Sequence, residues 1–234
     1  MEKKKLGVLG GMGPEATVDF YKKIVDHTQV NSDREHIDII IYNHASIPDR
    51  TECILCGKQE YLWDIISADI KMMSDAGCEY FAIPCNTCHY FADRLQEYTG
   101  GRFINMIEET AAYVASKGCR KAGVMATDGT VKRGMYHKAL EAHGIETVYP
   151  SEEMQKKVMS LIYDQIKRGE KGDKHQFIEI VNELKAAGCD CIILACTELS
   201  VFNVNYGLNS EFYVDAMDVL TKVCIEKCGG TYCG

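Results

Sequence analysis

The stretch AGCEYFAIPCNT at residues 76–87 returns as AGCDCIILACTE at residues 187–198, aligned without a gap at an offset of 111 residues. About seven of the twelve positions are identical or close substitutions. In each copy Ala-Gly-Cys and an acidic residue end a helical pattern, an apolar strand follows, and a cysteine stands where that strand meets the next helix. The repeat predicts two related halves in which Cys85 and Cys196 occupy equivalent positions.

Short apolar runs alternate with longer segments of helical spacing along the chain. The runs, bounded by glycine or polar residues, predict buried parallel strands at 6–10, 37–42, 80–84, 121–125, 145–149, 190–195 and 212–214. The helical spacing predicts helices at 15–30, 59–76, 107–117, 132–143, 152–168, 174–187 and 215–228. This order is a repeated βα pattern, so the predicted fold class is α/β with mainly parallel sheets.

Length and charge exclude several classes of protein. The 234 residues suffice for one large domain or two small ones. The net charge of −8, with no basic run after Lys3, Lys4 and Lys5, argues against a nucleic-acid or anionic-membrane surface. No apolar run approaches the roughly 18 residues of a membrane span, and no export signal is recognisable. We therefore expect a cytoplasmic protein whose twelve cysteines are reduced.

A second, weaker sequence similarity supports a division of the chain into two related halves. Residues 6–13, LGVLGGMG, and 122–129, AGVMATDG, both describe a strand that runs into a glycine turn. Ligands of open parallel sheets bind outside the carboxyl ends of the strands. Two halves that face each other would bring Cys85 and Cys196 to opposite walls of one cleft.

Two thiols on opposite sides of a carbon atom can invert a stereocentre that bears hydrogen. One removes a proton from one face and the other returns a proton to the opposite face, so one is thiolate while the other is thiol. A helix N-terminus favours the thiolate, and each cysteine precedes a predicted helix. Asn86, Thr87 and Thr197 can cap these helices, and backbone amides there can hold a substrate carboxylate.

Other interpretations of the cysteines stay open. A single buried cysteine at a strand end is most often inert packing. Cys85 and Cys88 have the CxxC spacing of a redox or zinc site, for which Cys53 and Cys56 could supply a second pair. His89 can tune the Cys85 thiolate, although a position on a helix surface is the simpler expectation.

The glycine turn at 10–13 does not complete the spacing of a nucleotide-binding fingerprint. It predicts instead a tight turn in which Pro14 takes the first helical position.

Three motifs together resemble the aspartate/glutamate racemase family: Gly10-Gly-Met-Gly-Pro-Glu-Ala-Thr, Pro84-Cys-Asn-Thr and Ala195-Cys-Thr-Glu. The resemblance implies two α/β domains related by a pseudo-twofold axis, with the active site in the cleft between them. It implies an N-terminal domain of residues 1–104 plus 209–234 and a second domain of 105–208. It further implies a homodimer that uses neither pyridoxal phosphate nor a metal. Cys88 departs from the family's pattern and is a candidate for oxidation beside the catalytic thiol.

The resemblance also implies roles for individual residues. Cys85 and Cys196 would be the two catalytic acid–bases. The substrate-binding residues would be Met12, Arg50, Asn86, Thr87, Thr127, Lys167, Thr197 and Glu198. Arg50 and Lys167 match positions that hold a side-chain carboxylate in aspartate-type members, since a guanidinium offers a bidentate fork and an ammonium adds charge. Without the family, Arg50 is equally well explained by a surface salt bridge and Lys167 by a solvated helix end.

The expected function is cofactor-independent racemisation of an acidic amino acid, with aspartate favoured. Within the family, the alternatives are a glutamate or broad-specificity amino-acid racemase, a hydantoin racemase, and an enzyme similar to maleate isomerase. Outside it, the alternative is a redox or zinc-binding cysteine protein.

Overall fold

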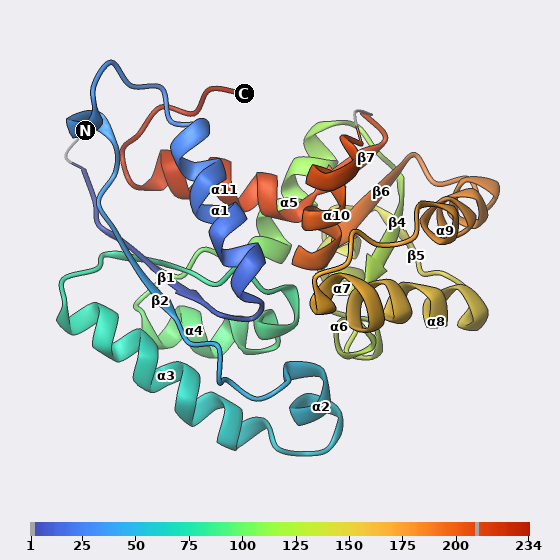
Figure 1. The fold of residues 1–234 in the computed structure, drawn as a ribbon, viewed down its shortest axis with the longest axis horizontal. Coiled ribbons are helices and arrows are strands. Elements are labelled where there is room, and N and C mark those ends of the chain that lie inside the picture. The colour runs from blue at the N-terminus through green and yellow to red at the C-terminus, as the bar shows by residue number, and fades with distance from the viewer. Residues whose placement is uncertain (1–2, 209–210) are drawn as a thin grey trace. The chain divides into compact units, whose positions relative to one another are not determined.

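The computed structural model describes residues 3–208 and 211–234. The chain folds into two compact units (Figure 1). The first unit comprises Met1–Met106 and Met217–Gly234, and the second comprises Ile107–Ala216. Each unit is described on its own below.

The first unit is built on a three-stranded parallel sheet with the order β2-β1-β3. Its strands are β1 (Leu6–Gly10), β2 (Ile39–Asn43) and β3 (Tyr80–Ala82). Leu6 of the fully buried central strand pairs with Ile39 on one side and with Tyr80 on the other. The helical elements are α1 (Pro14–Asp26), η1 (Asp33–Glu35), α2 (Arg50–Leu55), α3 (Gln59–Asp75), η2 (Asn86–Phe91), α4 (Ala92–Tyr98) and α11 (Ala216–Lys227).

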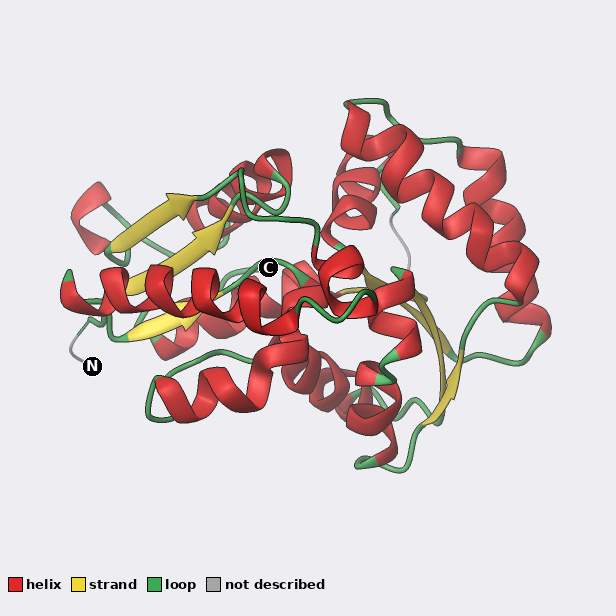
Figure 2. Ribbon diagram, turned by 90° about the horizontal axis from the view of Figure 1, so that it is seen from below, coloured by secondary structure: helices red, strands yellow, loops and turns green. Residues whose placement is uncertain are grey.

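The second unit contains a four-stranded parallel sheet with the order β5-β4-β6-β7. Figure 2 shows the strands of both units in yellow and the helices in red. Its strands are β4 (Lys121–Ala126), β5 (Glu146–Val148), β6 (Cys191–Ala195) and β7 (Tyr213–Asp215). The helical elements are α5 (Met106–Ser116), α6 (Asp128–Lys132), α7 (Met135–Glu141), α8 (Glu152–Ser160), η3 (Leu161–Gln165), η4 (Ile166–Arg168), α9 (Lys174–Ala186) and α10 (Thr197–Tyr206). The predicted α/β class with parallel sheets is confirmed.

The repeated Ala-Gly-Cys segments have the same backbone hydrogen bonds in both units. Gly77 after α3 and Gly188 after α9 adopt φ values of +84° and +82°, the left-handed conformation that ends a helix at glycine. The amide of Cys78 then donates to the carbonyl of Met73, and the amide of Cys189 donates to that of Leu184. The two segments are therefore the same helix-to-strand connection, built twice.

The acidic residue and the buried cysteine of each segment also match. The amide of Glu79 donates to the carbonyl of Lys5 at 2.8 Å, and that of Asp190 to the carbonyl of Lys121 at 2.7 Å. The Cys78 sulfur would lie 3.2 Å from a Cβ at Gly7, and the Cys189 sulfur 3.3 Å from one at Gly123. Glycine in the central strand leaves room for the cysteine, which explains the weaker similarity between 6–13 and 122–129.

The turn after β1 is closed by Thr17. Its hydroxyl accepts from the Gly11 amide and donates to the Gly13 carbonyl, both at 2.9 Å. A Cβ at Gly10 would collide with the Thr17 side chain, and Gly11 has φ +92° directly against the backbone of His44. Gly10 and Gly11 therefore have a packing role in this turn. Helix α1 begins at Pro14, as predicted.

Three features differ from the sequence-based expectations. In place of the helix expected at 132–143, the chain forms α7, preceded by the short helix α6, which ends at Lys132; Gly134 between them adopts a left-handed conformation. The helix expected at 152–168 continues beyond α8 only as a π-helical turn and a 3-10 turn. A helix was predicted to follow each cysteine, and η2 and α10 are these helices, whereas α2 and α4 were not predicted.

The second boundary between the units lies after Ala216, whereas the predicted return to the N-terminal domain was at residue 209. Strand β7 pairs with β6, and this pairing keeps residues 213–215 in the second unit. Residues 209 and 210 themselves lie outside the described part of the chain.

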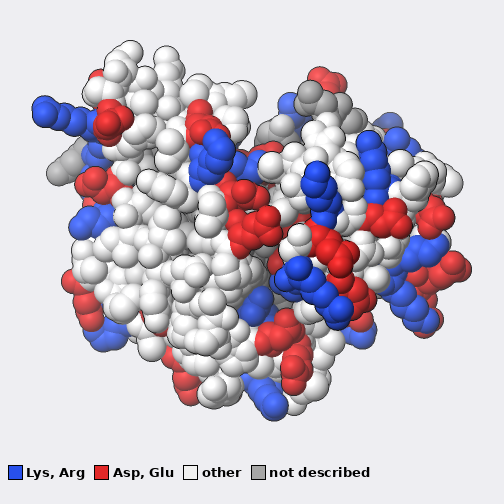
Figure 3. Space-filling model, in the orientation of Figure 1, with Lys and Arg blue, Asp and Glu red and all other residues white. Residues whose placement is uncertain are grey.

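Charged residues of both signs are interspersed on the face shown in Figure 3. Within residues 3–208 and 211–234, no helix is long and apolar enough to cross a bilayer.

Candidate functional site

Cys85 follows β3 in the first unit and is the N-cap residue of η2. Strand β3 ends at Ala82, and Pro84, which has no amide hydrogen to donate to a neighbouring strand, stands between the strand and the cysteine. The Cys85 amide donates to the Ile83 carbonyl at 2.7 Å, and its carbonyl accepts from the Cys88 amide at 3.1 Å. Asn86 and Thr87 form the first turn of η2, and like Cys85 they are buried.

Arg50 begins α2 after the N-cap Asp49, whose carboxylate accepts from the Glu52 amide. Its guanidinium donates to the carbonyls of Ile47, Pro48 and Met12 at 3.4, 3.1 and 3.3 Å. No carboxylate in the described part of the chain forms an ion pair with it. Arg50 is 9% exposed, so the surface salt bridge considered from the sequence is wrong for this residue.

The Arg50 guanidinium also hydrogen-bonds with the Cys85 side chain. Burial acts to lower the pKa of Arg50, but its electrostatic interactions with Cys85, Cys88 and Asp49 and its hydrogen bond with Cys85 outweigh burial and raise the pKa. By the same interaction, the guanidinium stabilises the thiolate form of Cys85.

Three sulfur atoms lie together in the first unit. The Cys88 thiol hydrogen-bonds with the Cys85 side chain and lies 3.3 Å from the sulfur of Met12. Burial, and then the hydrogen bond and charge of Cys85, raise the pKa of Cys88 well above its ordinary value. Cys88 is therefore a protonated thiol beside Cys85.

His89 links the turn at Cys85 to the backbone at Met106 through both of its ring nitrogens. Its Nδ1 lies 3.0 Å from the Cys85 carbonyl, and its Nε2 accepts from the Met106 amide at 3.0 Å. Burial lowers the pKa of His89 to about 4, so the ring is neutral at pH 7 with its proton on Nδ1. His89 is 4% exposed, which corrects the expectation of a helix-surface histidine.

Cys196 follows β6 in the second unit and is the N-cap residue of α10, as Cys85 is of η2. Its thiol donates to Oε2 of Glu198 at 2.9 Å, and Oε1 of the same carboxylate forms an ion pair with Lys167. Burial, followed by the negative charge of Glu198, raises the pKa of Cys196 well above its ordinary value, while Lys167 opposes this. The neighbouring Thr197 is 2% exposed.

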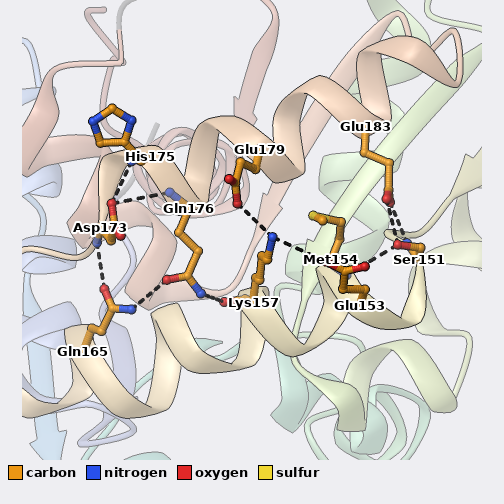
Figure 4. A network of polar contacts seen from close by, with 10 residues as sticks. All are labelled: Ser151, Glu153, Met154, Lys157, Gln165, Asp173, His175, Gln176, Glu179 and Glu183. Atoms are coloured by element: carbon orange, nitrogen blue, oxygen red, sulfur yellow. Dashed lines mark hydrogen bonds and ion pairs between the residues drawn. The ribbon is translucent and has the colours of Figure 1, made fainter.

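Lys167 reaches Glu198 from the 3-10 turn η4, and polar contacts fix the turn before it (Figure 4). The side chain of Gln165 accepts from the Asp173 amide at 2.7 Å and donates to Gln176 at 2.9 Å. Gln176 in turn donates to the carbonyl of Lys157 in α8 at 2.8 Å. Lys167 is thus an ion-pair partner of a buried carboxylate, and the solvated helix end considered from the sequence is wrong.

Thr127 is the N-cap residue of α6, at the carboxyl end of β4. The register pairs Ala126 with Ala195, so Thr127 and Cys196 leave neighbouring strands at the same level. The Thr127 hydroxyl lies 3.3 Å from that of Thr130. In the first unit, Met12 likewise follows β1, which neighbours the strand before Cys85. In each unit, the sequence-predicted residues thus gather at and beside the carboxyl ends of two neighbouring strands, β1 and β3 in the first unit and β4 and β6 in the second.

Sequence reasoning missed two buried residues near Cys196. Asp215 ends β7, next to β6, and its carboxylate accepts from Ser200 at 2.6 Å and from Asn203 at 3.2 Å. Both donors lie on α10, so Asp215 fixes the helix that carries Cys196. Tyr136 is buried, and burial raises its pKa, with charge on Asp215 and Cys196 acting in the same direction. The position of Asp215 at a strand end was the available signal.

The two thiols have opposite electrostatic partners. Cys85 lies beside a guanidinium, which favours the thiolate, whereas Cys196 donates to a carboxylate, which favours the thiol. One base and one acid are the pair that stereochemical inversion needs. Within residues 3–208 and 211–234, no three His, Cys, Asp or Glu side chains are grouped so as to hold a metal ion.

Comparison with known proteins places this chain in a family. The family model of Asp/Glu/hydantoin racemases matches residues 9–224, so the chain belongs to that family. It is 26% identical over 201 residues to the broad specificity amino-acid racemase RacX of Bacillus subtilis (strain 168), covering 83% of this chain and 86% of that protein.

Solved structures agree with the family. The aspartate racemase of Picrophilus torridus superimposes with a TM-score of 0.85 at 29% identity, covering 98% of this chain and 96% of that one. An aspartate racemase homologue from Pyrococcus horikoshii OT3 superimposes with a TM-score of 0.77 at 26% identity, covering 96% and 99%. The chain is therefore an isomerase, a racemase that acts on a small molecule.

Proposed function

We propose that this enzyme racemises an acidic amino acid, with aspartate favoured, by a two-base mechanism in which Cys85 and Cys196 act on opposite faces of the α-carbon. The observation that carries the proposal is the contrast in charge between two equivalent strand ends. Arg50 contacts Cys85, and Glu198 accepts the thiol hydrogen of Cys196.

The proposed step balances protons. The Cys85 thiolate takes the α-proton of one enantiomer and becomes a thiol, while the Cys196 thiol gives its proton to the opposite face and becomes a thiolate. Lys167, beside Glu198, offsets the negative charge that then develops near Cys196. The opposite enantiomer reverses both roles, so the thiols alone carry the protons and no bound cofactor takes part in the step.

An acidic substrate is supported by the state of Arg50. Besides its contact with Cys85, the buried guanidinium donates to neutral carbonyls, and it can add a charge-assisted bond to a substrate carboxylate. We assign Arg50, with Lys167, to the side-chain carboxylate. The α-carboxylate and ammonium would be bound by the remaining strand-end residues, Met12, Asn86, Thr87, Thr127, Thr197 and Glu198.

We further propose a homodimer in the cytoplasm, where a reducing environment maintains both thiols. Size-exclusion chromatography with light scattering tests the oligomeric state, since a dimer has twice the mass of the 26.2 kDa chain. A monomer at micromolar concentration would contradict this part of the proposal.

The test of the reaction is proton NMR in deuterated water with reduced enzyme and no added cofactor. L-aspartate, L-glutamate and a neutral amino acid are incubated separately, with heat-unfolded enzyme as the control. Loss of the α-proton signal together with loss of optical rotation is expected first for aspartate. Equal rates for the neutral amino acid would indicate the broad specificity that the Bacillus subtilis relative's name describes. If no amino acid exchanges, the assignment is wrong, and a hydantoin and maleate become the substrates to test.

A further inference from the structure

Cys88 has no part in the proposed proton transfer, yet its thiol lies against the proposed catalytic one. Cys85 caps the 3-10 turn η2, and Cys88 stands three residues later, with its amide bonded to the Cys85 carbonyl at 3.1 Å. The side chain of an N-cap residue lies over the first turn of its helix, and the thiols of Cys85 and Cys88 hydrogen-bond there.

The residues around Cys85 and Cys88 favour different protonation states of the two sulfurs. The Arg50 guanidinium stabilises a thiolate at Cys85, and a thiolate is the form that attacks an oxidant. Cys88 is completely buried against the sulfur of Met12 and remains a thiol, ready to attack a modified Cys85.

The second unit lacks this arrangement. At the offset of 111 residues, the position that corresponds to Cys88 is Leu199, a buried residue of α10. The Cys196 thiol donates to Glu198 instead. The repeat therefore retains the proposed catalytic cysteine in both halves but places a second thiol beside only one of them.

We propose that Cys85 and Cys88 are a redox modification site, at which a hydroperoxide converts the two thiols into a reversible disulfide. The Cys85 thiolate attacks the peroxide, so that an S–O bond forms, the O–O bond breaks, and hydroxide leaves and takes up a proton as water. Cys88 then attacks the Cys85 sulfur, forming the S–S bond and expelling the second oxygen as water with the Cys88 proton. Two thiols are oxidised by two electrons, and one hydrogen peroxide is reduced to two waters.

The consequence for activity rests on the proposed function, because a disulfide removes the thiolate of Cys85 that accepts the α-proton. The disulfide stops the reaction and, at the same time, keeps Cys85 from irreversible oxidation to sulfinic or sulfonic acid. A dithiol reductant restores both thiols and the activity.

The experiment treats the full-length enzyme with excess hydrogen peroxide, removes the oxidant, and measures racemisation before and after dithiothreitol. Peptide mass spectrometry is performed in parallel. For the wild type, we expect at least about a tenfold loss of activity, a mass loss of about 2 Da in the peptide carrying residues 85–88, and nearly full recovery.

The variant Cys88→Ser is expected to lose activity in peroxide without recovery, with two or three oxygens added to Cys85. Cys88→Ala replaces it if the serine variant does not fold. Cys119→Ser is the matched control, because Cys119 belongs to another hydrogen-bonded thiol pair, with Cys191. This control should lose and recover activity as the wild type does.

Three results would overturn the proposal: a disulfide mapped only to other cysteines, irreversible oxidation of Cys85 in the wild type, or recovery of Cys88→Ser equal to that of the wild type. The peptide masses require no substrate. A mapped Cys85–Cys88 disulfide in an enzyme that racemises no amino acid would therefore contradict the proposed function and leave the modification site standing.

Discussion

The neutral, buried His89 predicts that acid destabilises this fold in a defined pH range. Its pKa is about 4 in the folded protein, lowered by burial from 6.5. Between these values the unfolded chain binds a proton that the folded chain does not, so the free energy of unfolding falls as pH falls from about 6.5 to 4. A difference of about 2.5 pH units corresponds to about 3 kcal/mol. Above pH 6.5 the ring is neutral in both states and contributes no slope.

The assay is urea unfolding at closely spaced pH values between 4 and 8. The variant His89→Gln should be less stable at pH 7, since it loses a hydrogen bond at the Cys85 turn, but its stability should fall about 3 kcal/mol less on acidification. His137→Gln is the control, because His137 is exposed on α7 and should leave the wild-type slope unchanged. An unchanged slope in His89→Gln would refute the reasoning. If that variant does not fold, an NMR titration of His89 decides instead, and a midpoint above pH 6 would refute it.

Further predictions concern the candidate site and the repeat. Arg50→Lys keeps the charge but loses the planar fork, so kcat/KM for aspartate should fall about 10- to 100-fold in steady-state assays, against a smaller loss for a neutral amino acid. A uniform loss for both substrates would contradict the assigned role. Lys167→Met leaves the Glu198 carboxylate buried without its ion-pair partner and should lower kcat/KM for aspartate at least about 100-fold; an unchanged kcat/KM would argue against Lys167. Gly77→Ala and Gly188→Ala should each destabilise the fold by about 1 kcal/mol in urea unfolding, because both residues end a helix at positive φ. A loss of stability in only one of the two variants would argue against the structural equivalence of Gly77 and Gly188.

Much of the fold could be predicted from local pattern. Each predicted strand corresponds to an observed strand, because the short apolar runs pair in parallel sheets, although the edge strands β2 and β5 are only partly buried. The Ala-Gly-Cys repeat marks a helix end and a strand start that depend on hydrogen bonds within a few residues. Helix breaks were not predictable in the same way. Gly134 interrupts a continuous helical pattern, and the π-helical turn after α8 retains the spacing of a helix.

The candidate site was predictable in residue identity but not in contacts. The repeat located Cys85 and Cys196 at equivalent strand ends, where the structure has them. The partners of these thiols depend on how distant elements pack. Lys167 meets Glu198 across 31 residues, and Arg50 meets the Cys85 turn across 35. His89 Nε2 accepts from the amide of Met106, a partner 17 residues away that no local spacing reveals.

The central claim is that two thiols act on opposite faces of one carbon, and α-proton exchange by single-cysteine variants tests it most directly. Cys85→Ala and Cys196→Ala are incubated separately with L- and D-aspartate in deuterated water, and exchange and optical rotation are followed together. The two-base mechanism predicts that neither variant interconverts the enantiomers. It also predicts that each variant exchanges the α-proton of one enantiomer only, with opposite preferences in the two variants. Interconversion at the wild-type rate by either variant would contradict the account.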